Sequence, residues 1–208
     1  MNTIAIIDYG MSNLSSVAKA VKYVAPNEKV IISSNPNEID SAEKVIFPGQ
    51  GAAEKCMESI HNKKLSEVIK KNSSEKPFLG ICMGMQVLME FSNENNGTEC
   101  LGIIKGSVER FETQENQKIK IPHMGWNKII KKQDHPIWHN IEDESYFYFV
   151  HSYFINPLDE SNIIGETEYG GTFSSVIAHN NIIAIQGHPE KSSDTGLQFL
   201  KNFIQIQQ

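Results

Sequence analysis

Residues 77–84 read Pro77-Phe78-Leu79-Gly80-Ile81-Cys82-Met83-Gly84, an apolar run that ends in a Gly-x-Cys-x-Gly motif. Short apolar runs bounded by turn residues are typical of strands buried on both faces of a sheet. A helix-like stretch follows over residues 84–90, so Cys82 is expected at a sharp strand-to-helix turn. Such a turn, a nucleophile elbow, forces the central side chain outwards, and the flanking glycines relieve the crowding.

On the N-terminal side of this motif, strand and helix signals alternate. Apolar runs predict strands at residues 4–7, 30–32 and 45–47. Apolar residues at helical spacing predict helices over residues 13–24 and 52–71, the second with a break near Asn62. Strands that alternate with helices indicate a mainly parallel sheet covered on both faces.

The second half of the chain changes character. Strand-like segments follow one another without helices between them, at residues 108–111, 126–130, 146–150, 163–167, 176–178 and 182–186. A last amphipathic helix is expected over residues 194–206, and the most loop-like stretches are residues 93–98 and 112–118. We therefore expect an α/β fold whose mainly parallel central sheet is flanked by helices, with additional antiparallel strands in the second half. No linker or repeat divides the sequence, so one domain over residues 1–208 is expected.

Composition excludes several classes of function. The chain of 208 residues has a formal net charge of −6 and no Lys/Arg block, which argues against a nucleic-acid partner. No stretch approaches the roughly 18 apolar residues of a membrane span, and the first residues lack a signal peptide's basic region. Three widely spaced cysteines fit neither a disulfide framework nor a zinc site, and reduced thiols suggest a cytoplasmic location. His135 and His139 have Pro136 between them and no third ligand nearby, so no metal is expected.

The context of Cys82 predicts a nucleophile. A helix N-terminus favours a thiolate over a thiol and places backbone N–H groups, here that of Met83, near a developing oxyanion. Cys56 and Cys100 lack this context and are interpreted as small buried hydrophobes.

A thiol nucleophile needs a base, and the base needs an orienting group. The segment Gln186-Gly187-His188-Pro189-Glu190 supplies both after an apolar strand, at the sheet edge where ligands of parallel sheets bind. An extended His-Pro-Glu backbone would place both side chains on one side, so that Glu190 holds the His188 imidazole.

A third feature, Phe47-Pro48-Gly49-Gln50-Gly51, follows a predicted strand. Glycine-rich backbone in that position turns N–H groups towards an anion. We therefore interpret Gly49, Gln50 and Gly51 as part of an oxyanion hole, with an ordinary strand-to-helix turn as the alternative.

These motifs resemble those of class I, triad-type, glutamine amidotransferases. The general likeness is carried by Gly80-Ile81-Cys82-Met83-Gly84-Met85-Gln86 and by His188-Pro189-Glu190. A narrower likeness, to the glutaminase subunits of imidazole glycerol phosphate synthases, covers nearly the whole chain. It rests on Asp8-Tyr9-Gly10-Met11-Ser12-Asn13-Leu14, on Pro122-His123-Met124-Gly125-Trp126-Asn127, and on the stretches 146–153 and 196–203.

The resemblance implies roles for particular residues. Cys82 matches the nucleophile, His188 the general acid and base, and Glu190 the residue that orients the imidazole. The positions that match a glutamine pocket are Gln86, Glu94, His151, Ser152 and Tyr153.

Gly49 to Gly51 match a strand that rearranges before hydrolysis in this family. Gln50 stands where the family usually has Val, Ser12 where it has a second Gly, and Gly187 where it often has Phe. None of these departures removes a catalytic group, and Gln50 is the one placed to alter the rearrangement.

The resemblance also implies a partner and no cofactor. Ammonia released from L-glutamine would pass to a cyclase subunit with a (β/α)₈ barrel, in a heterodimer of the histidine pathway. Such a barrel takes about 250 residues, so it is expected on another polypeptide.

Other functions remain open from the sequence. A paralogue of these subunits supplies ammonia for amidination of surface sugars. An inactive module that only regulates a barrel partner is a second alternative, and a cysteine peptidase or other hydrolase on the same fold is a third. Intact Cys82, His188 and Glu190 argue against the inactive module, and Gln86 argues against the peptidase.

Overall fold

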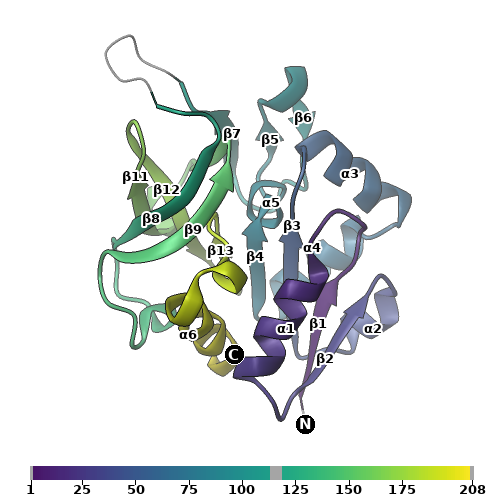
Figure 1. Ribbon diagram of the computed structural model, residues 1–208. Coiled ribbons are helices and arrows are strands. Elements are labelled where there is room, and N and C mark those ends of the chain that lie inside the picture. The colour runs from purple at the N-terminus through teal and green to yellow at the C-terminus, as the bar shows by residue number, and fades with distance from the viewer. Residues whose placement is uncertain (1, 113–118, 207–208) are drawn as a thin grey trace.

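The structure is a computed structural model that describes residues 2–112 and 119–206. Its strands join into one connected sheet with helices against both faces (Figure 1). The strands are β1 Thr3–Ile7, β2 Lys29–Ser33, β3 Lys44–Gly49, β4 Phe78–Cys82, β5 Phe91–Ser92, β6 Thr98–Glu99, β7 Gly106–Arg110, β8 His123–Lys131, β9 Ser145–His151, β10 Tyr153–Pro157, β11 Ile163–Glu168, β12 Thr172–His179 and β13 Ile182–Ile185. The α-helices are α1 Leu14–Val24, α2 Pro36–Asp40, α3 Ala53–Asn62, α4 Ser66–Glu75, α5 Met83–Gln86 and α6 Ser193–Gln205.

The first part of the sheet is parallel, as predicted. Its strand order is β2-β1-β3-β4-β13, and each neighbouring pair runs in the same direction. Strands β4 and β13 are buried along their whole length. Strands covered on both faces have no solvated side, which is why their sequences are continuous apolar runs.

The second part of the sheet is mostly antiparallel, which confirms the expected change of character. Beyond β13 the order continues through β12, β10 and β7 in antiparallel pairs. The hairpin of β8 and β9 joins the sheet through β11 (Figure 1). Most of the loop predicted at residues 112–118 lies outside the described residues.

Two hydrophobic cores lie on opposite faces of the sheet. Helices α1 and α6 bury Val17, Val21, Phe199 and Phe203 on one face. Helices α2, α3 and α4 bury their apolar side chains on the other. The parallel strands are therefore covered on both faces, and the carboxyl ends of the neighbouring strands β3, β4 and β13 lie side by side.

The helix expected after Cys82 is shorter than predicted. It ends at Gln86, and Val87 to Met89 turn into the loop before β5. Their backbone carbonyls accept from a neighbouring segment instead: Val87 from the N–H of Leu101, and Leu88 from those of Ile103 and Ile104. The helix predicted over residues 52–71 is broken after Asn62, close to the expected place.

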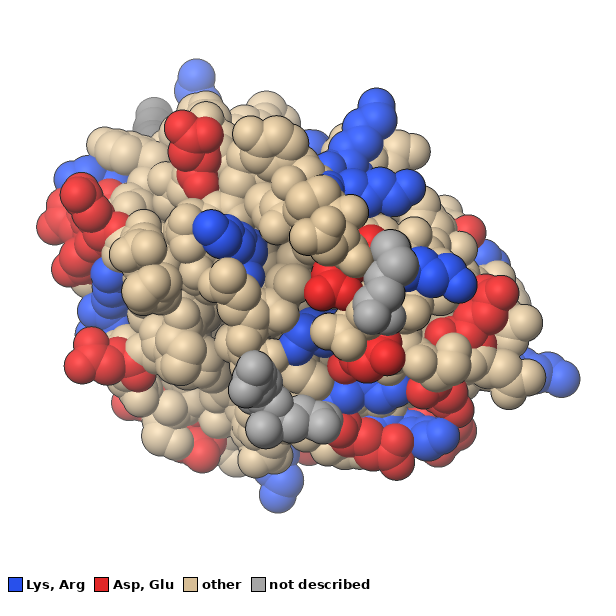
Figure 2. Space-filling model, turned by 90° about the horizontal axis from the view of Figure 1, so that it is seen from below, with Lys and Arg blue, Asp and Glu red and all other residues tan. Residues whose placement is uncertain are grey.

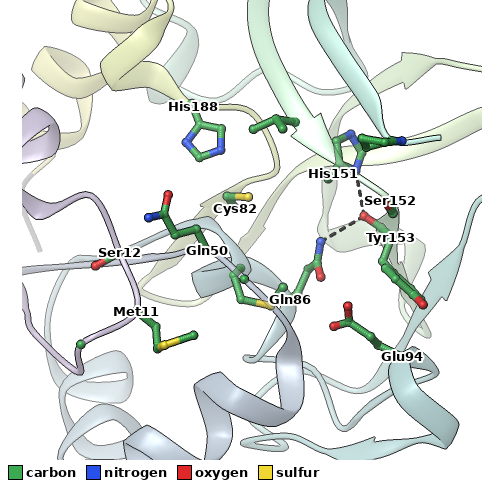
Figure 3. Close-up of a pocket in the computed structure, with 15 residues that line it drawn as sticks. Met11, Ser12, Gln50, Cys82, Gln86, Glu94, His151, Ser152, Tyr153 and His188 are labelled. Atoms are coloured by element: carbon green, nitrogen blue, oxygen red, sulfur yellow. Dashed lines mark hydrogen bonds between the residues drawn. The ribbon is translucent and has the colours of Figure 1, made fainter. Parts of the chain in front are cut away.

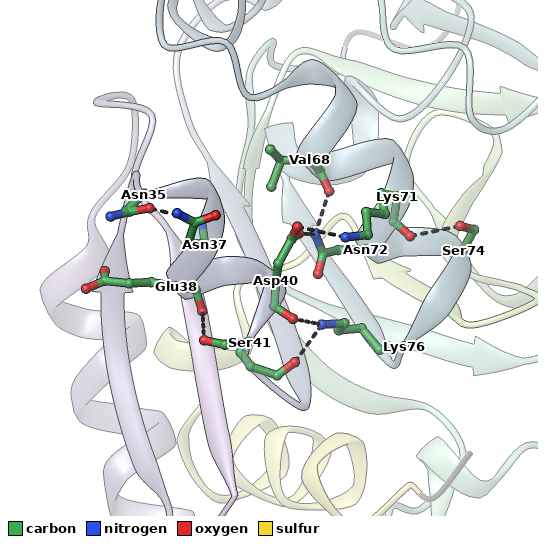
Figure 4. A network of polar contacts seen from close by, with 11 residues as sticks. Asn35, Asn37, Glu38, Asp40, Ser41, Val68, Lys71, Asn72, Ser74 and Lys76 are labelled. Atoms are coloured by element: carbon green, nitrogen blue, oxygen red, sulfur yellow. Dashed lines mark hydrogen bonds and ion pairs between the residues drawn. The ribbon is translucent and has the colours of Figure 1, made fainter.

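A polar network fixes α2 against α4 at the outer side of the sheet (Figure 4). The Asp40 carboxylate accepts from Lys71 Nζ at 2.8 Å and from Asn72 Nδ2 at 2.6 Å. Lys76 Nζ donates to the carbonyl oxygens of Asp40 and Ala42. The hydrogen bond from Lys71 and then that from Asn72 lower the pKa of Asp40, which keeps this carboxylate ionised and the helix pair together.

The surface carries both signs of charge. On the face drawn in Figure 2, Lys and Arg side chains are interspersed with Asp and Glu, without a basic stripe. Within residues 2–112 and 119–206, no helix has the length and apolar character needed to cross a membrane.

Candidate active site

Three parallel strand ends meet at one edge of the sheet and form the floor of a cavity of about 670 Å³ (Figure 3). Strand β4 lies between β3 and β13, and Cys82 is aligned with Gly49 across the β3–β4 pair. The residues that line the cavity are Gly10, Met11, Ser12, Gln50, Gly51, Cys82, Met83, Gln86, Glu94, Pro122, Val150, His151, Ser152, Tyr153 and His188. The residues predicted for the site therefore come together, with Gly49 and Glu190 lying just outside the lining.

Cys82 has the backbone of a nucleophile elbow. Its φ of 54° and ψ of −113° are strained values for a residue with a side chain. The turn brings α5 so close to β3 that a Cβ on Gly84 would lie 1.8 Å from the Phe47 carbonyl oxygen. A glycine at position 84 is thus required for the geometry that presents the Cys82 side chain to the cavity.

His188 and Glu190 form a buried pair just after β13. His188 Nδ1 lies 2.8 Å from Glu190 Oε1, and the two side chains are only 5% and 3% exposed. The predicted contact is present, but the extended backbone predicted for it is wrong. Pro189–Lys191 is a turn of 3₁₀ helix, and this turn, rather than strand-like alternation, brings the carboxylate to the imidazole.

The loop that carries His188 is fastened to β9. The N–H of His188 donates to the carbonyl oxygen of Tyr148 at 2.8 Å. The N–H of Tyr148 in turn donates to Ser192 Oγ at 3.0 Å, and Ser192 Oγ donates to the His188 carbonyl oxygen. A shift of the β8–β9 hairpin would therefore move the imidazole.

The electrostatics favour a charged imidazole. Burial lowers the pKa of His188, but the electrostatic attraction of Cys82 and the hydrogen bond to Glu190 outweigh it and raise the pKa to about 10. Nε2 is the ring nitrogen not used by Glu190, and it has no hydrogen-bond partner within the described part of the chain. It is available to transfer a proton between the thiol and a bound substrate.

Gln50, which lines the cavity with Cys82, has its backbone N–H bound to another residue. This group donates to the Met11 carbonyl oxygen at 2.8 Å. The Gln50 carbonyl oxygen accepts from the Cys56 thiol at 3.5 Å. There is no room for a side chain at Gly49, because a Cβ there would lie 2.2 Å from the Tyr9 hydroxyl oxygen. In this arrangement the Gln50 N–H does not complete an oxyanion hole.

The far end of the cavity holds the residues predicted to bind a substrate. Gln86 and Glu94 lie beside Tyr153, and His151 and Ser152 line the same cavity (Figure 3). Glu94 Oε2 accepts from the N–H of Ala53 at 2.7 Å, which fixes the carboxylate at the start of α3. Among residues 2–112 and 119–206, no group of three His, Cys, Asp or Glu is arranged to hold a metal ion.

Two contacts of the site were missed from the sequence. The Gln186 Nε2 donates to Cys82 Sγ at 3.7 Å, and the Met11 carbonyl holds the Gln50 N–H. The place of Gln186 in the site could have been predicted, because it is a polar residue directly after an apolar strand, at the end of the sheet where ligands bind. The Met11 contact involves only backbone atoms, so the pattern of side chains in the sequence could not predict it.

Comparisons with known proteins agree over nearly the full chain. The sequence model of the family described as glutamine amidotransferase class-I matches residues 5–206. The imidazole glycerol phosphate synthase subunit HisH of Hydrogenovibrio crunogenus is 53% identical over 202 residues, which cover 97% of this chain and 95% of that protein. The protein of the same name from Aromatoleum aromaticum is 47% identical, with 98% of each chain covered.

Solved structures share the fold at low sequence identity. PurLQS from Thermotoga maritima superposes with a TM-score of 0.73 at 16% identity, over 99% of this chain and 97% of that one. A glutamine amidotransferase from the same organism gives a TM-score of 0.62 at 16% identity, over 98% of this chain and 82% of that one. These likenesses concern the α/β architecture alone.

Proposed function

Since the chain belongs to the class-I glutamine amidotransferase family, we propose that it is the glutaminase subunit of an imidazole glycerol phosphate synthase. It hydrolyses L-glutamine to glutamate and ammonia for a separate cyclase subunit. The observation that carries the proposal is the convergence of Cys82, His188 and Glu190 at the ends of two neighbouring parallel strands. That geometry supports acyl transfer from a carboxamide through a cysteine thioester.

The reaction begins with attack of the Cys82 thiolate on the side-chain amide carbon of glutamine. The carbonyl oxygen takes up negative charge and is stabilised by backbone N–H groups, among them that of Met83. The protonated His188 then gives its proton to the departing nitrogen, which leaves as ammonia. The product is a thioester between Cys82 and the γ-carbonyl of glutamate.

Water completes the cycle. Neutral His188 takes a proton from water, the resulting hydroxide equivalent adds to the thioester carbon, and the sulfur leaves as thiolate. Glu190 stabilises the imidazolium formed in each half-reaction and holds its orientation through Nδ1. Glutamate is released, and the imidazolium–thiolate pair is restored.

We assign the recognition of glutamine to the far end of the cavity. The Glu94 carboxylate supplies negative charge for the α-ammonium group, while Gln86 and the segment His151-Ser152-Tyr153 offer hydrogen-bonding groups. This places the side-chain amide of the ligand towards Cys82 and Gln50.

The partner is proposed to be a cyclase with a (β/α)₈ barrel, in a heterodimer. Ammonia at neutral pH is mostly protonated and unreactive, so it has to travel through an enclosed route. The exposed apolar side chains of Met124, Trp126 and Tyr146 on the β8–β9 hairpin, which are 62%, 53% and 51% exposed, support docking next to the His188 loop.

The decisive experiment is co-purification with a candidate cyclase subunit, followed by measurement of glutamate release with and without the acceptor ligand. We expect stable association and glutaminase activity that rises with the ligand. Complementation of a histidine auxotroph separates this function from ammonia supply for sugar amidination. Absence of glutamate release from an intact, liganded complex would rule the proposal out.

A further inference from the structure

Two histidines outside the proposed triad face each other inside the β8–β9 hairpin. His123 and His151 are directly opposite in the antiparallel ladder. His123 Nδ1 lies 2.9 Å from His151 Nε2, and both residues are buried. Neighbouring Met124 and Trp126 point outwards and are exposed, so the pair lies between the proposed docking face and the cavity.

The neighbouring groups fix which ring nitrogens carry protons. His151 Nδ1 lies 2.8 Å from the Tyr153 carbonyl oxygen, which can only accept, so this nitrogen is the donor. In a neutral ring, His151 Nε2 must then accept, and His123 Nδ1 donates to it. His123 Nε2 is left to accept from Asn127 Nδ2 at 3.2 Å.

The orientation of the Asn127 amide is fixed independently. Its Nδ2 donates to the Glu168 carbonyl oxygen at 2.9 Å, and its Oδ1 accepts from the N–H of Lys128 at 2.8 Å. All the bonds therefore run in one direction, from Asn127 through the two imidazoles to Tyr153.

The surroundings keep both rings neutral. The His123 ring lies between Tyr169 and Phe149, with ring centroids 3.9 Å and 4.9 Å away and nearly parallel planes. Burial lowers the pKa of His123 to about 4. Burial lowers that of His151 to about 3, against the hydrogen bond to the Tyr153 carbonyl, which raises it. A proton on Nε2 of His151 would face the N–H of His123.

The chain of bonds ends on a residue of the proposed glutamine pocket. The Tyr153 carbonyl oxygen also accepts from Gln86 Nε2 at 3.0 Å, so both bonds converge on it (Figure 3). Gln86 Nε2 donates its other hydrogen to Gln186 Oε1 at 3.0 Å. Gln86 Oε1 is buried and has no partner among the residues that the structure describes. The amide is thus held in one orientation, and its oxygen is the acceptor left without a partner.

We propose that His123 and His151 are a positioning pair that fixes the Tyr153 carbonyl and, through it, the orientation in which Gln86 presents its amide oxygen to an N–H group of glutamine. The assignment rests on the proposed glutaminase function. Neither imidazole exchanges a proton in the reaction. The pair fixes the hydrogen-bond acceptor that the binding pocket offers to glutamine. It also connects the pocket to the hairpin that faces the partner.

The test compares three variants of His123 in the complex with the cyclase. His123→Asn keeps a donor at the position of Nδ1, whereas His123→Gln keeps a polar group only at the position of Nε2. His123→Phe keeps the aromatic stack and neither hydrogen bond. The Asn and Gln variants lose the ring equally and serve as matched controls for its packing.

We expect His123→Asn to keep a KM for glutamine within about threefold of the wild type. His123→Gln and His123→Phe should raise it about tenfold, which corresponds to the loss of one hydrogen bond. The kcat at saturating glutamine should change less, and synthesis from added ammonium salts should be unaffected. If His123→Phe performs as well as His123→Asn, ring packing suffices and the pair does not position Gln86.

A second measurement does not depend on activity. Nitrogen-15 NMR of the labelled isolated chain at pH 7 should show both rings neutral and protonated on Nδ1. A ring protonated on Nε2, or charged, would overturn the proposal. An inactive wild-type complex would instead contradict the glutaminase function, and an active one with indistinguishable His123 variants would contradict only the pair.

Discussion

The backbone N–H of Gln50 is bound to the carbonyl oxygen of Met11 at 2.8 Å, although Gln50 lines the same cavity as Cys82. The loop after β1 thus holds a donor that would otherwise be available to an oxyanion. Rotation of the peptide between Gly49 and Gln50 would free it, and glycine at position 49 makes that rotation inexpensive.

We therefore expect the isolated chain to be nearly inactive and the liganded complex to be about 10² to 10³ times faster, the usual effect of one oxyanion donor. Gln50→Pro removes the N–H and should reduce the complex towards the rate of the isolated chain. Gln50→Val keeps the N–H and is the matched control. Steady-state glutamate release measures both, and full activity in the isolated chain would exclude the switch.

Cys82→Ala should abolish glutamine-dependent synthesis by the complex, because no other thiol lines the cavity among the described residues. The same complex should still make product from ammonium salts at raised pH, since only the ammonia source is lost. Product formation from each nitrogen source is the measurement. Loss of both reactions would point to a structural role for Cys82.

Glu190→Gln should lower glutaminase turnover while leaving the KM for glutamine nearly unchanged. The carboxylate contacts His188 Nδ1 and does not line the cavity, so it acts on the imidazolium and not on the ligand. A neutral amide at this position also removes one of the charges that raise the pKa of His188. A turnover equal to that of the wild type would remove Glu190 from the triad.

Alkylation at pH 8 should modify Cys82 before the other two cysteines. Burial raises the pKa of Cys56 to about 11 and that of Cys100 to about 12. At most about one thiol in a thousand is then ionised at either position, and the thiolate is the reactive form. Peptide mapping after brief iodoacetamide treatment should find one adduct, at Cys82. Early labelling of Cys56 would mean that α3 opens in solution.

The free energy of unfolding should fall as the pH drops from about 6.5 to about 4. His123 and His151 have lowered pKa values in the folded protein, about 4 and about 3, so in this range the unfolded chain binds more protons. Each histidine contributes a slope of up to about 1.4 kcal/mol per pH unit. Urea unfolding at several pH values should give a shallower slope for His123→Phe than for the wild type. Equal slopes would mean that His123 is charged in the folded state.

Much of this architecture could be predicted, because local pattern and global fold agree in the parallel half. Buried strands such as β4 and β13 are continuous apolar runs, and α1 and α6 carry apolar residues at helical spacing. Strand β10 was missed because Asn156 and Pro157 interrupt its pattern. Strands β5 and β6 have two residues each, too few to show any period.

The site was predictable where side chains carry the chemistry. The convergence of Cys82, His188 and Glu190 was predicted from residue type and from their place after apolar strands, and the structure brings them together. The contacts of Gln186 with Cys82 and of Met11 with Gln50 depend on how distant segments approach one another. No local pattern encodes them, and only the folded sheet brings those atoms together.

The position of β13 between β4 and β12 also has a consequence for the protein during its synthesis. Gln186, at the end of β13, lies 104 residues after Cys82, and contacts between such distant segments form slowly. Until β13 leaves the ribosome and pairs with β4, the nascent chain carries Cys82 without His188 beside it. We therefore expect incomplete chains to hydrolyse no glutamine, and activity to appear only after β13 has paired with β4.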